Sequence, residues 1–188
     1  MLAAPPRRFT VEEYHRLAEV GVLHEDDRVE LLNGVIVDMM PIGPFHGGSV
    51  NRLIRMFERI SRDRWVTSAQ NPVHIGKHNE PQPDLLILRP RDDFYAENHP
   101  RPNDVFLLIE VSDSTLLIDR DDKLPIYATA GIAEVWIVNL PERLVEVYSS
   151  PQSGAYTEMR EVHPGGALAP AAFPDAAIDT AALLGAGA

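Results

Sequence analysis

Hydrophobic residues at helical spacing predict two helices in the first third of the chain. Thr10-Val-Glu-Glu13 matches a capping box, in which each end residue's side chain accepts a hydrogen bond from the other's amide. A helix is therefore expected from about Thr10 to Val20. After the Pro/Gly-rich stretch 41–48, apolar residues at spacings of three and four predict an amphipathic helix that begins close to His46. These residues are Val50, Leu53, Ile54, Phe57 and Ile60.

Runs of apolar residues predict the strands. Asn33-Gly34 lies between two such runs and predicts a hairpin over residues 29–39, because a type I′ turn needs positive φ at both central positions. The runs 84–88 and 105–111 are continuously apolar, which is typical of strands buried on both faces of a sheet. The remaining strand candidates are 65–75 with a break at Pro72, 134–138, 144–148 and 156–162.

A third helix is predicted from Ile118 to Ala130, with Gly131 as its C-terminal cap and Pro125 acceptable only in a first turn. The Ala/Pro-rich tail from Gly165 suggests loops and one short helix. Helices thus precede and interrupt five or more strands, without a repeat or linker. This order predicts one α/β domain of the α+β type, with an N-terminal helix and β-hairpin and a mixed central β-sheet flanked by helices.

Composition supports a compact globular domain. Of the 188 residues, 45% are hydrophobic and 24% charged, and both fractions are ordinary for such proteins. The absence of cysteine excludes disulfides, zinc–thiolate sites and thiol nucleophiles. The first residues lack the apolar core of a signal peptide, and no segment approaches the roughly 20 apolar residues that span a bilayer. We therefore expect a cytoplasmic protein with no membrane partner.

The formal net charge of −11 counts against a broad basic surface that would coat nucleic acid. Any polynucleotide would have to be bound by a local patch. Five arginines lie at spacings that could place several of them along one helical face, although a solvated face explains them equally simply. They are Arg52, Arg55, Arg59, Arg62 and Arg64.

Two carboxylates mark the ends of the continuously apolar strands. Asp84 opens one strand and Glu110 lies near the end of the next, so both fall at the same sheet edge if the strands are antiparallel. Carboxylates about 5 Å apart repel by roughly 3 kcal/mol at an effective dielectric near 20, which a bound cation or shared proton would offset. Mg²⁺ suits such oxygen ligands, and Lys123 on the following helix could stabilise charge in a phosphoryl transition state.

Spacing alone leaves other interpretations open. Acidic residues at strand ends often cap loops or face solvent. Lys123 lies four residues after Asp119, so an exposed ion pair on one helical face would also account for it. Aromatic residues Tyr127 and Trp136 are expected in the core. The histidines show no zinc-ligand spacing, and the motifs of serine hydrolases, P-loops and dinucleotide-binding folds are absent from the sequence.

Several short motifs follow one another in a recognisable order. They are Arg28-Val-Glu30-Leu-Leu-Asn-Gly34, His46, Pro83-Asp84, Ile109-Glu110-Val-Ser112-Asp-Ser-Thr115, Asp119-Arg-Asp-Asp-Lys123, Tyr127 and Gly131-Ile-Ala-Glu-Val-Trp136. This succession resembles the Uma family of putative restriction endonucleases, in the PD-(D/E)XK nuclease superfamily. The resemblance extends from about Phe9 to Tyr148 and implies a single nuclease domain over 1–188, with a core at 9–162 and an Ala/Pro-rich C-terminal segment at 163–188.

The resemblance also implies roles for individual residues. Asp84 and Glu110 are the motif acids that hold Mg²⁺, for which Mn²⁺ can substitute, and Glu30 is an additional acid that completes the metal shell or orients a metal-bound water. The common pattern has a lysine two residues after the second acid, where this chain has Ser112, so the catalytic lysine role passes to Lys123. Ser112 is then an accessory residue. His46 is either an accessory phosphate contact or base, or simply a helix N-terminal residue.

Together these inferences predict a Mg²⁺-dependent endonuclease that hydrolyses DNA phosphodiester bonds and acts as a homodimer. Two alternatives stay open. A catalytically inactive interaction module with the nuclease fold would explain the acidic balance and the serine at position 112. A metal-dependent hydrolase of a smaller phosphoester would need less positive charge than a DNA-binding enzyme.

Overall fold

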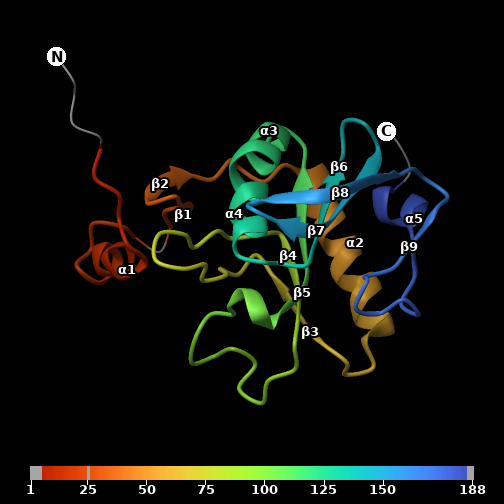
Figure 1. Ribbon diagram of the computed structural model, residues 1–188, viewed down its shortest axis with the longest axis horizontal. Coiled ribbons are helices and arrows are strands. Elements are labelled where there is room, and N and C mark those ends of the chain that lie inside the picture. Colours follow the sequence, from red (N-terminus) through yellow and green to blue (C-terminus); the bar gives the residue numbers. More distant parts are fainter. Residues whose placement is uncertain (1–5, 25, 186–188) are drawn as a thin grey trace.

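A six-stranded mixed sheet forms the centre of the computed structural model, which describes residues 6–24 and 26–185 (Figure 1). The strand order is β3-β4-β5-β6-β7-β8; β5 and β6 run parallel and every other neighbouring pair is antiparallel. The predicted mixed sheet is therefore confirmed. The strands are β3 (Val66–Ala69), β4 (Leu85–Leu88), β5 (Val105–Ser112), β6 (Glu134–Asn139), β7 (Leu144–Gln152) and β8 (Ala155–Val162).

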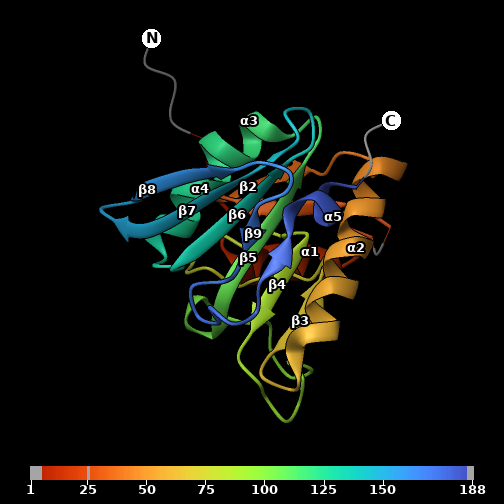
Figure 2. The same cartoon turned by 90° about the vertical axis from the view of Figure 1, so that its right-hand side faces the viewer.

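Helices cover both faces of this sheet (Figure 2). Helices α2 (Pro44–Ser61) and α5 (Thr180–Leu184) pack on one face. The other face is covered by one continuous helical segment composed of α3 (Leu116–Ile118), the π-helical turn η2 (Asp119–Lys123) and α4 (Leu124–Thr129). Side chains along the central strands alternate between the two cores, as the period of a strand requires: Leu85 and Ile87 of β4 face α2, whereas Leu86 and Leu88 face α4.

The N-terminal elements match their predictions. Helix α1 (Val11–Glu19) begins after Thr10, and both hydrogen bonds of the capping box are present, at 3.1 and 3.2 Å. Strands β1 (Val29–Leu32) and β2 (Val35–Asp38) form the hairpin, with φ values of 50° at Asn33 and 73° at Gly34. The amide of Glu80 donates to the Leu31 carbonyl at 2.8 Å, so the hairpin lies against the segment that leads into β4.

Two strand predictions need correction. The run 65–75 forms only the short β3, because the chain takes a positive φ of 52° at Gln70 and Pro72 follows. The C-terminal tail contains its predicted short helix, α5, and also a two-stranded ribbon that we did not predict, β9 (Ala167–Leu168) and β10 (Ile178–Asp179). The loop before β5 adds a 3₁₀ turn, η1 (Pro102–Asp104). Within the described residues, no helix is long and apolar enough to cross a membrane.

Candidate active site

Asp84 and Glu110 lie side by side at one edge of the sheet. Leu85 of β4 pairs with Ile109 of β5 in an antiparallel ladder, which places Asp84 beside Glu110 and Val111. The Val111 amide donates to Asp84 Oδ2 at 2.8 Å and fixes the carboxylate there. The condition under which both acids fall at the same sheet edge, antiparallel pairing of these two strands, is therefore met.

The alternation of β5 explains which way Glu110 points. Ile109 and Val111 enter the core under α2, so Glu110 and Ser112 face the opposite side, toward η2 and α4. There the Glu110 side chain is buried, with 3% exposure, and its Oε1 accepts a hydrogen bond from the Tyr127 hydroxyl at 2.6 Å. Glu110 is thus held by a residue that we expected only to fill the core.

Lys123 lies at the centre of three carboxylates. Its Nζ is 3.1 Å from Glu30 Oε1, 3.4 Å from Glu110 Oε1 and 3.9 Å from Asp119 Oδ1. Its side chain is 8% exposed, and the three acids are as deeply buried. The exposed Lys123–Asp119 pair of the simpler interpretation is therefore wrong: the pair exists, but within a buried cluster that joins the hairpin, β5 and η2.

Burial and charge act in opposite directions on the ionisable groups of this cluster. Burial alone would lower the pKa of Lys123, but Glu110, Glu30 and Asp119 more than reverse this effect and raise it well above its usual range. Burial raises the pKa of Glu110, which the Lys123 ammonium only partly counteracts. Lys123 therefore stays protonated throughout the neutral pH range.

The π-helical turn orients the side chains that the helical segment contributes. The Leu124 amide donates to the Asp119 carbonyl, five residues back, and Pro125 in the first turn of α4 has no amide to donate. On this widened turn Asp119 and Lys123 face the sheet, and Tyr127 follows one turn later on the same side. π-Helical turns are frequent at functional sites.

A second buried pair anchors η2 to the sheet. Glu110, Ile137 and Glu146 pair in one row across β5, β6 and β7, so both glutamates face the helical segment. The Glu146 carboxylate is fully buried and accepts from Arg120 Nε at 3.0 Å, and a second Arg120 nitrogen contacts its other oxygen. The Asn139 amide and the Tyr148 hydroxyl also donate to it, at 2.8 and 2.7 Å.

Glu146→Gln should destabilise the protein and make its stability less dependent on pH in the acid range. Burial raises the pKa of Glu146, but hydrogen bonds from Arg120, Tyr148 and Asn139 outweigh burial and leave this pKa below its usual value. The charged form therefore stabilises the fold above pH 4.5, and this contribution is lost as the pH falls through the lowered pKa. We expect Glu146→Gln to cost about 1–3 kcal/mol at pH 7, measured by urea unfolding, because its partners lose charge-assisted hydrogen bonds.

The loss should shrink as the pH falls through the acid range, where the wild-type carboxyl group is itself neutralised. Glu142→Gln, at an exposed position in the turn before β7, is the matched control and should leave stability unchanged at every pH. An equal loss for both variants, or a loss that persists at low pH, would contradict this assignment.

The two accessory residues each contact one acid of the site. His46, in the first turn of α2, lies 3.1 Å from Asp84 Oδ2 through its Nε2, and this hydrogen bond raises the pKa of the imidazole. The Ser112 hydroxyl donates to Asp119 Oδ2 at 2.7 Å. Ser112 thus holds Asp119, one of the three acids around Lys123. Lys123 extends toward the same acid from the helical segment.

An open pocket of about 100 Å³ exposes this arrangement to solvent. The segment between β2 and α2 forms one side of the pocket, and the turn after β5 together with η2 forms another. Asp84 and the three acids around Lys123 line it, together with two exposed acids, Asp38 and Asp113. The charged lining residues are Arg28, Glu30, Asp38, Asp84, Glu110, Asp113, Asp119 and Lys123.

The donor atoms suit a hard divalent cation, although no complete metal cage is preformed. Across residues 6–24 and 26–185, no group of three His, Cys, Asp or Glu side chains is already arranged around a point that would hold a metal. The contacts of Asp84 with Val111 and His46 end on Oδ2, and those of Glu110 with Tyr127 and Lys123 end on Oε1. One oxygen of each carboxylate is left for an ion, and two carboxylates with water and phosphate suffice for Mg²⁺.

Glu30 makes different contacts from those of Asp84. Its Oε1 contacts Lys123, and its Oε2 accepts from the Gln82 amide at 3.1 Å. Both oxygens are thus engaged within the protein. A direct contact between Glu30 and a metal stays a prediction, whereas its contact with the lysine is part of the fold.

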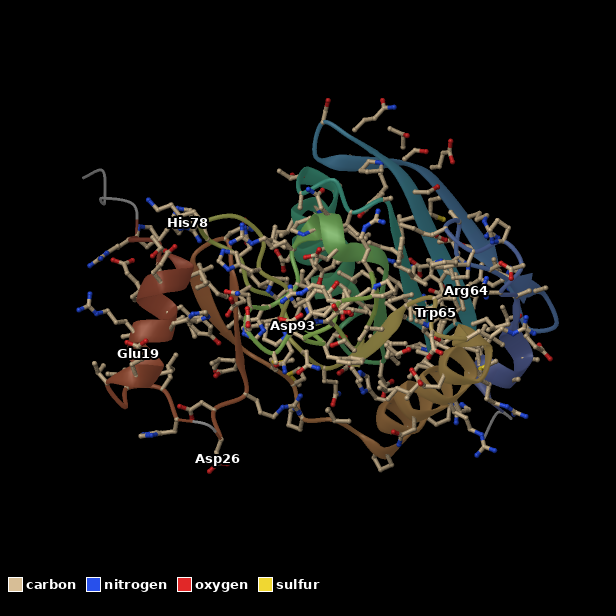
Figure 3. All side chains as sticks on the ribbon, turned by 90° about the horizontal axis from the view of Figure 1, so that it is seen from below. Glu19, Asp26, Arg64, Trp65, His78 and Asp93 are labelled. Carbon is tan, nitrogen blue, oxygen red and sulfur yellow. The ribbon has the colours of Figure 1, made fainter. Side chains whose placement is uncertain are left out.

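The five arginines of the 52–64 region do not form one basic face. Arg52 donates to the Leu183 carbonyl of α5, and Arg62 and Arg64 lie beyond the end of α2. The guanidinium carbon of Arg64 lies 5.0 Å from the ring centre of Trp65, and both residues are labelled in Figure 3. Arg64 also forms an ion pair with Asp175. Only Arg55 and Arg59 remain as an exposed pair on the helix.

Comparison with known proteins identifies the family. The profile of the Uma2 family, described as "Putative restriction endonuclease", matches residues 11–181. The chain belongs to the Uma2 family. The family resemblance inferred from the motif order is thereby confirmed, and this Uma2 domain spans nearly all of the chain. No curated protein matches it.

A solved structure supports the fold of this Uma2 protein. The crystal structure of a protein from Anabaena variabilis, described as a putative nuclease belonging to DUF820, superposes with a TM-score of 0.69. The match covers 94% of this chain and 97% of that one, at 18% sequence identity. At this identity the similarity establishes a shared architecture.

Proposed function

We propose that the protein is a metal-dependent nuclease that hydrolyses DNA phosphodiester bonds. The observation that carries this proposal is the permanently charged ammonium of Lys123, held by Glu30 and Glu110 in the pocket that also contains Asp84. A buried positive charge next to oxygen ligands is suited to a reaction in which negative charge grows on a phosphate. Family membership supports the same reaction class.

Asp84 and Glu110 would hold Mg²⁺, or Mn²⁺ in its place, with Glu30 as the proposed third acid. The ion would lower the pKa of water and neutralise phosphate charge. Hydrolysis adds a water oxygen to phosphorus and breaks one bond from phosphorus to a sugar oxygen. Lys123 would donate hydrogen bonds to the phosphate as charge accumulates; its raised pKa argues against a role as proton acceptor. Tyr127 would keep Glu110 in position.

Metal dependence tests the proposal. Purified protein should convert supercoiled plasmid to nicked circles with Mg²⁺ or Mn²⁺ and should stop when EDTA is added. Asp84→Asn removes one ligand charge, and we expect at least tenfold weaker Mn²⁺ binding by calorimetry, together with slower nicking. Asp122→Asn, an exposed acid on η2, is the control. Nicking that is equally fast in EDTA, or in Asp84→Asn, would refute the assignment.

One feature of the pocket favours a second substrate class. The pocket is lined by six acids and has a volume of about 100 Å³. It would accommodate a small phosphoester that chelates a metal as well as one nucleotide of a polymer. Competition between free nucleotides and DNA would separate the two, because a small-molecule enzyme should prefer the nucleotide. We also expect a homodimer, since double-strand cleavage is commonly performed by symmetric pairs; light scattering of the purified chain measures this directly.

A further inference from the structure

One side of the candidate pocket is apolar. The end of β2 and the segment that joins it to α2 contribute Val37, Met39, Met40, Pro41 and Ile42 to the lining. Met40 is 55% exposed and Ile42 40%, so the outer part of this apolar wall, defined as Val37 and residues 39–42, faces solvent, whereas Val37 packs against the core. The site therefore combines acids with an accessible hydrophobic surface.

The charges around this pocket are unfavourable for a DNA duplex. The pocket lining contains two Lys or Arg side chains, Arg28 and Lys123, and six acids. Lys123 is already surrounded by three of these acids. A duplex meets a protein mainly through the phosphates of both strands, which require several cationic contacts. Its bases are stacked within the helix and cannot lie flat against an apolar wall.

We propose that the site binds an unpaired nucleotide of a single strand, with its base against the apolar wall and its phosphate beside Lys123, where a metal ion held by Asp84 and Glu110 would contact it. This proposal rests on the proposed nuclease function and specifies its substrate. An unstacked base offers a π-face that apolar side chains cover, and methionine thioethers contact aromatic rings favourably. A single strand also brings fewer phosphates to an acidic surface than a duplex does.

The wall also predicts how the site would read sequence. Aliphatic and thioether groups offer no hydrogen-bond donors or acceptors to base edges, and every base has a face that can be covered. Recognition should therefore tolerate any base. In natural substrates the cut would fall in single-stranded regions, flaps or melted segments.

Three oligonucleotides of one sequence test this inference: a labelled single strand, its perfect duplex, and a duplex with a central mismatched bubble. With Mn²⁺, the wild-type protein should cleave the single strand at least tenfold faster than the duplex and should cut the third substrate within the bubble. Equilibrium binding in EDTA, measured by fluorescence anisotropy, should show the same preference. Equal cleavage of duplex and single strand would overturn the substrate assignment while supporting a nuclease.

A matched pair of methionines tests the wall itself. Met40 and Met159 are both 55% exposed, but Met159 lies on β8, outside the pocket lining. Met40→Ser should weaken binding of the single strand about tenfold in EDTA, whereas Met159→Ser should not change it. Equal affinity of both variants would overturn the proposal. A second outcome would also overturn it. If the wild-type protein is a dimer, and Met40→Ser but not Met159→Ser makes it monomeric without loss of affinity for the single strand, the wall is a subunit interface.

The same measurements separate this inference from the proposed function. If no oligonucleotide is cleaved with any metal, the nuclease function fails. If the single strand is then bound no more tightly than the duplex, the substrate inference fails as well. Cleavage restricted to duplex leaves the nuclease intact and refutes only the unpaired nucleotide.

Discussion

Replacing Lys123 with methionine should remove about 3–5 kcal/mol of folding stability at neutral pH, the range found when one partner of a buried ion pair is deleted. The lysine lies within 3.9 Å of three buried acids, and methionine fills similar space without charge. The remaining acids, whose side chains are only 4–5% exposed, would then repel one another. Urea unfolding at pH 7 measures the loss as a lower midpoint.

The pH dependence distinguishes charge from packing. The pKa of Glu110 is already raised by burial, and loss of the ammonium that counteracts burial would raise it further. A group whose pKa is higher in the folded state than in the unfolded chain stabilises the fold at low pH, and this stabilisation is lost as the pH rises through the folded-state pKa. The loss of unfolding free energy in Lys123→Met should therefore be largest near pH 8 and shrink toward pH 5.

Lys77 supplies the control, because it is the only other lysine in the sequence and its side chain is exposed. Lys77→Met should unfold with the wild-type midpoint at both pH values. A Lys123→Met deficit that is constant between pH 8 and pH 5 would indicate lost packing instead of unbalanced carboxylates. Nicking activity should also disappear in Lys123→Met at pH 5, where the folded variant is least destabilised.

The elements of the fold were predictable because their signals are local. The capping box at Thr10 and the Asn33-Gly34 turn each determine the backbone within a few residues. The continuous apolar runs of β4 and β5 indicated burial on both faces, whereas the meeting of their acids at one edge depended on antiparallel pairing, which the structure shows. The length of β3 was not predictable, because the chain leaves the ladder at Gln70 with a positive φ that an apolar run does not reveal.

The environment of the site depended on register, which a single sequence does not disclose. The Arg120–Glu146 contact spans 26 positions, and it forms because Glu110, Ile137 and Glu146 share one row of the sheet. That row requires β5 and β6 to pair in parallel. Lys123 was assigned by resemblance and its pairing with Asp119 was considered from spacing, whereas its contacts with Glu30 and Glu110 became visible only in the structure. The hydroxyl of Tyr127 was missed for the same reason.

Glu110→Gln should abolish most activity while preserving the fold. Glutamine keeps the side-chain length and an oxygen that accepts from the Tyr127 hydroxyl, and Lys123 retains Glu30 at 3.1 Å. Removing a buried carboxyl group whose pKa is already raised should not lower the free energy of unfolding at pH 7, because ionisation of this group does not stabilise the folded state.

Catalysis by the same variant should fall by roughly 10²–10³-fold, the range found for removing one charge-stabilising group from an active site. Nicking rates with saturating Mn²⁺, measured alongside urea midpoints, separate the two effects. Glu142→Gln is the control, since its side chain is exposed and lies outside the pocket lining. If Glu110→Gln keeps its midpoint and nicks as fast as Glu142→Gln, the buried acid is structural. The metal and the reaction would then have to be assigned to other residues of the pocket.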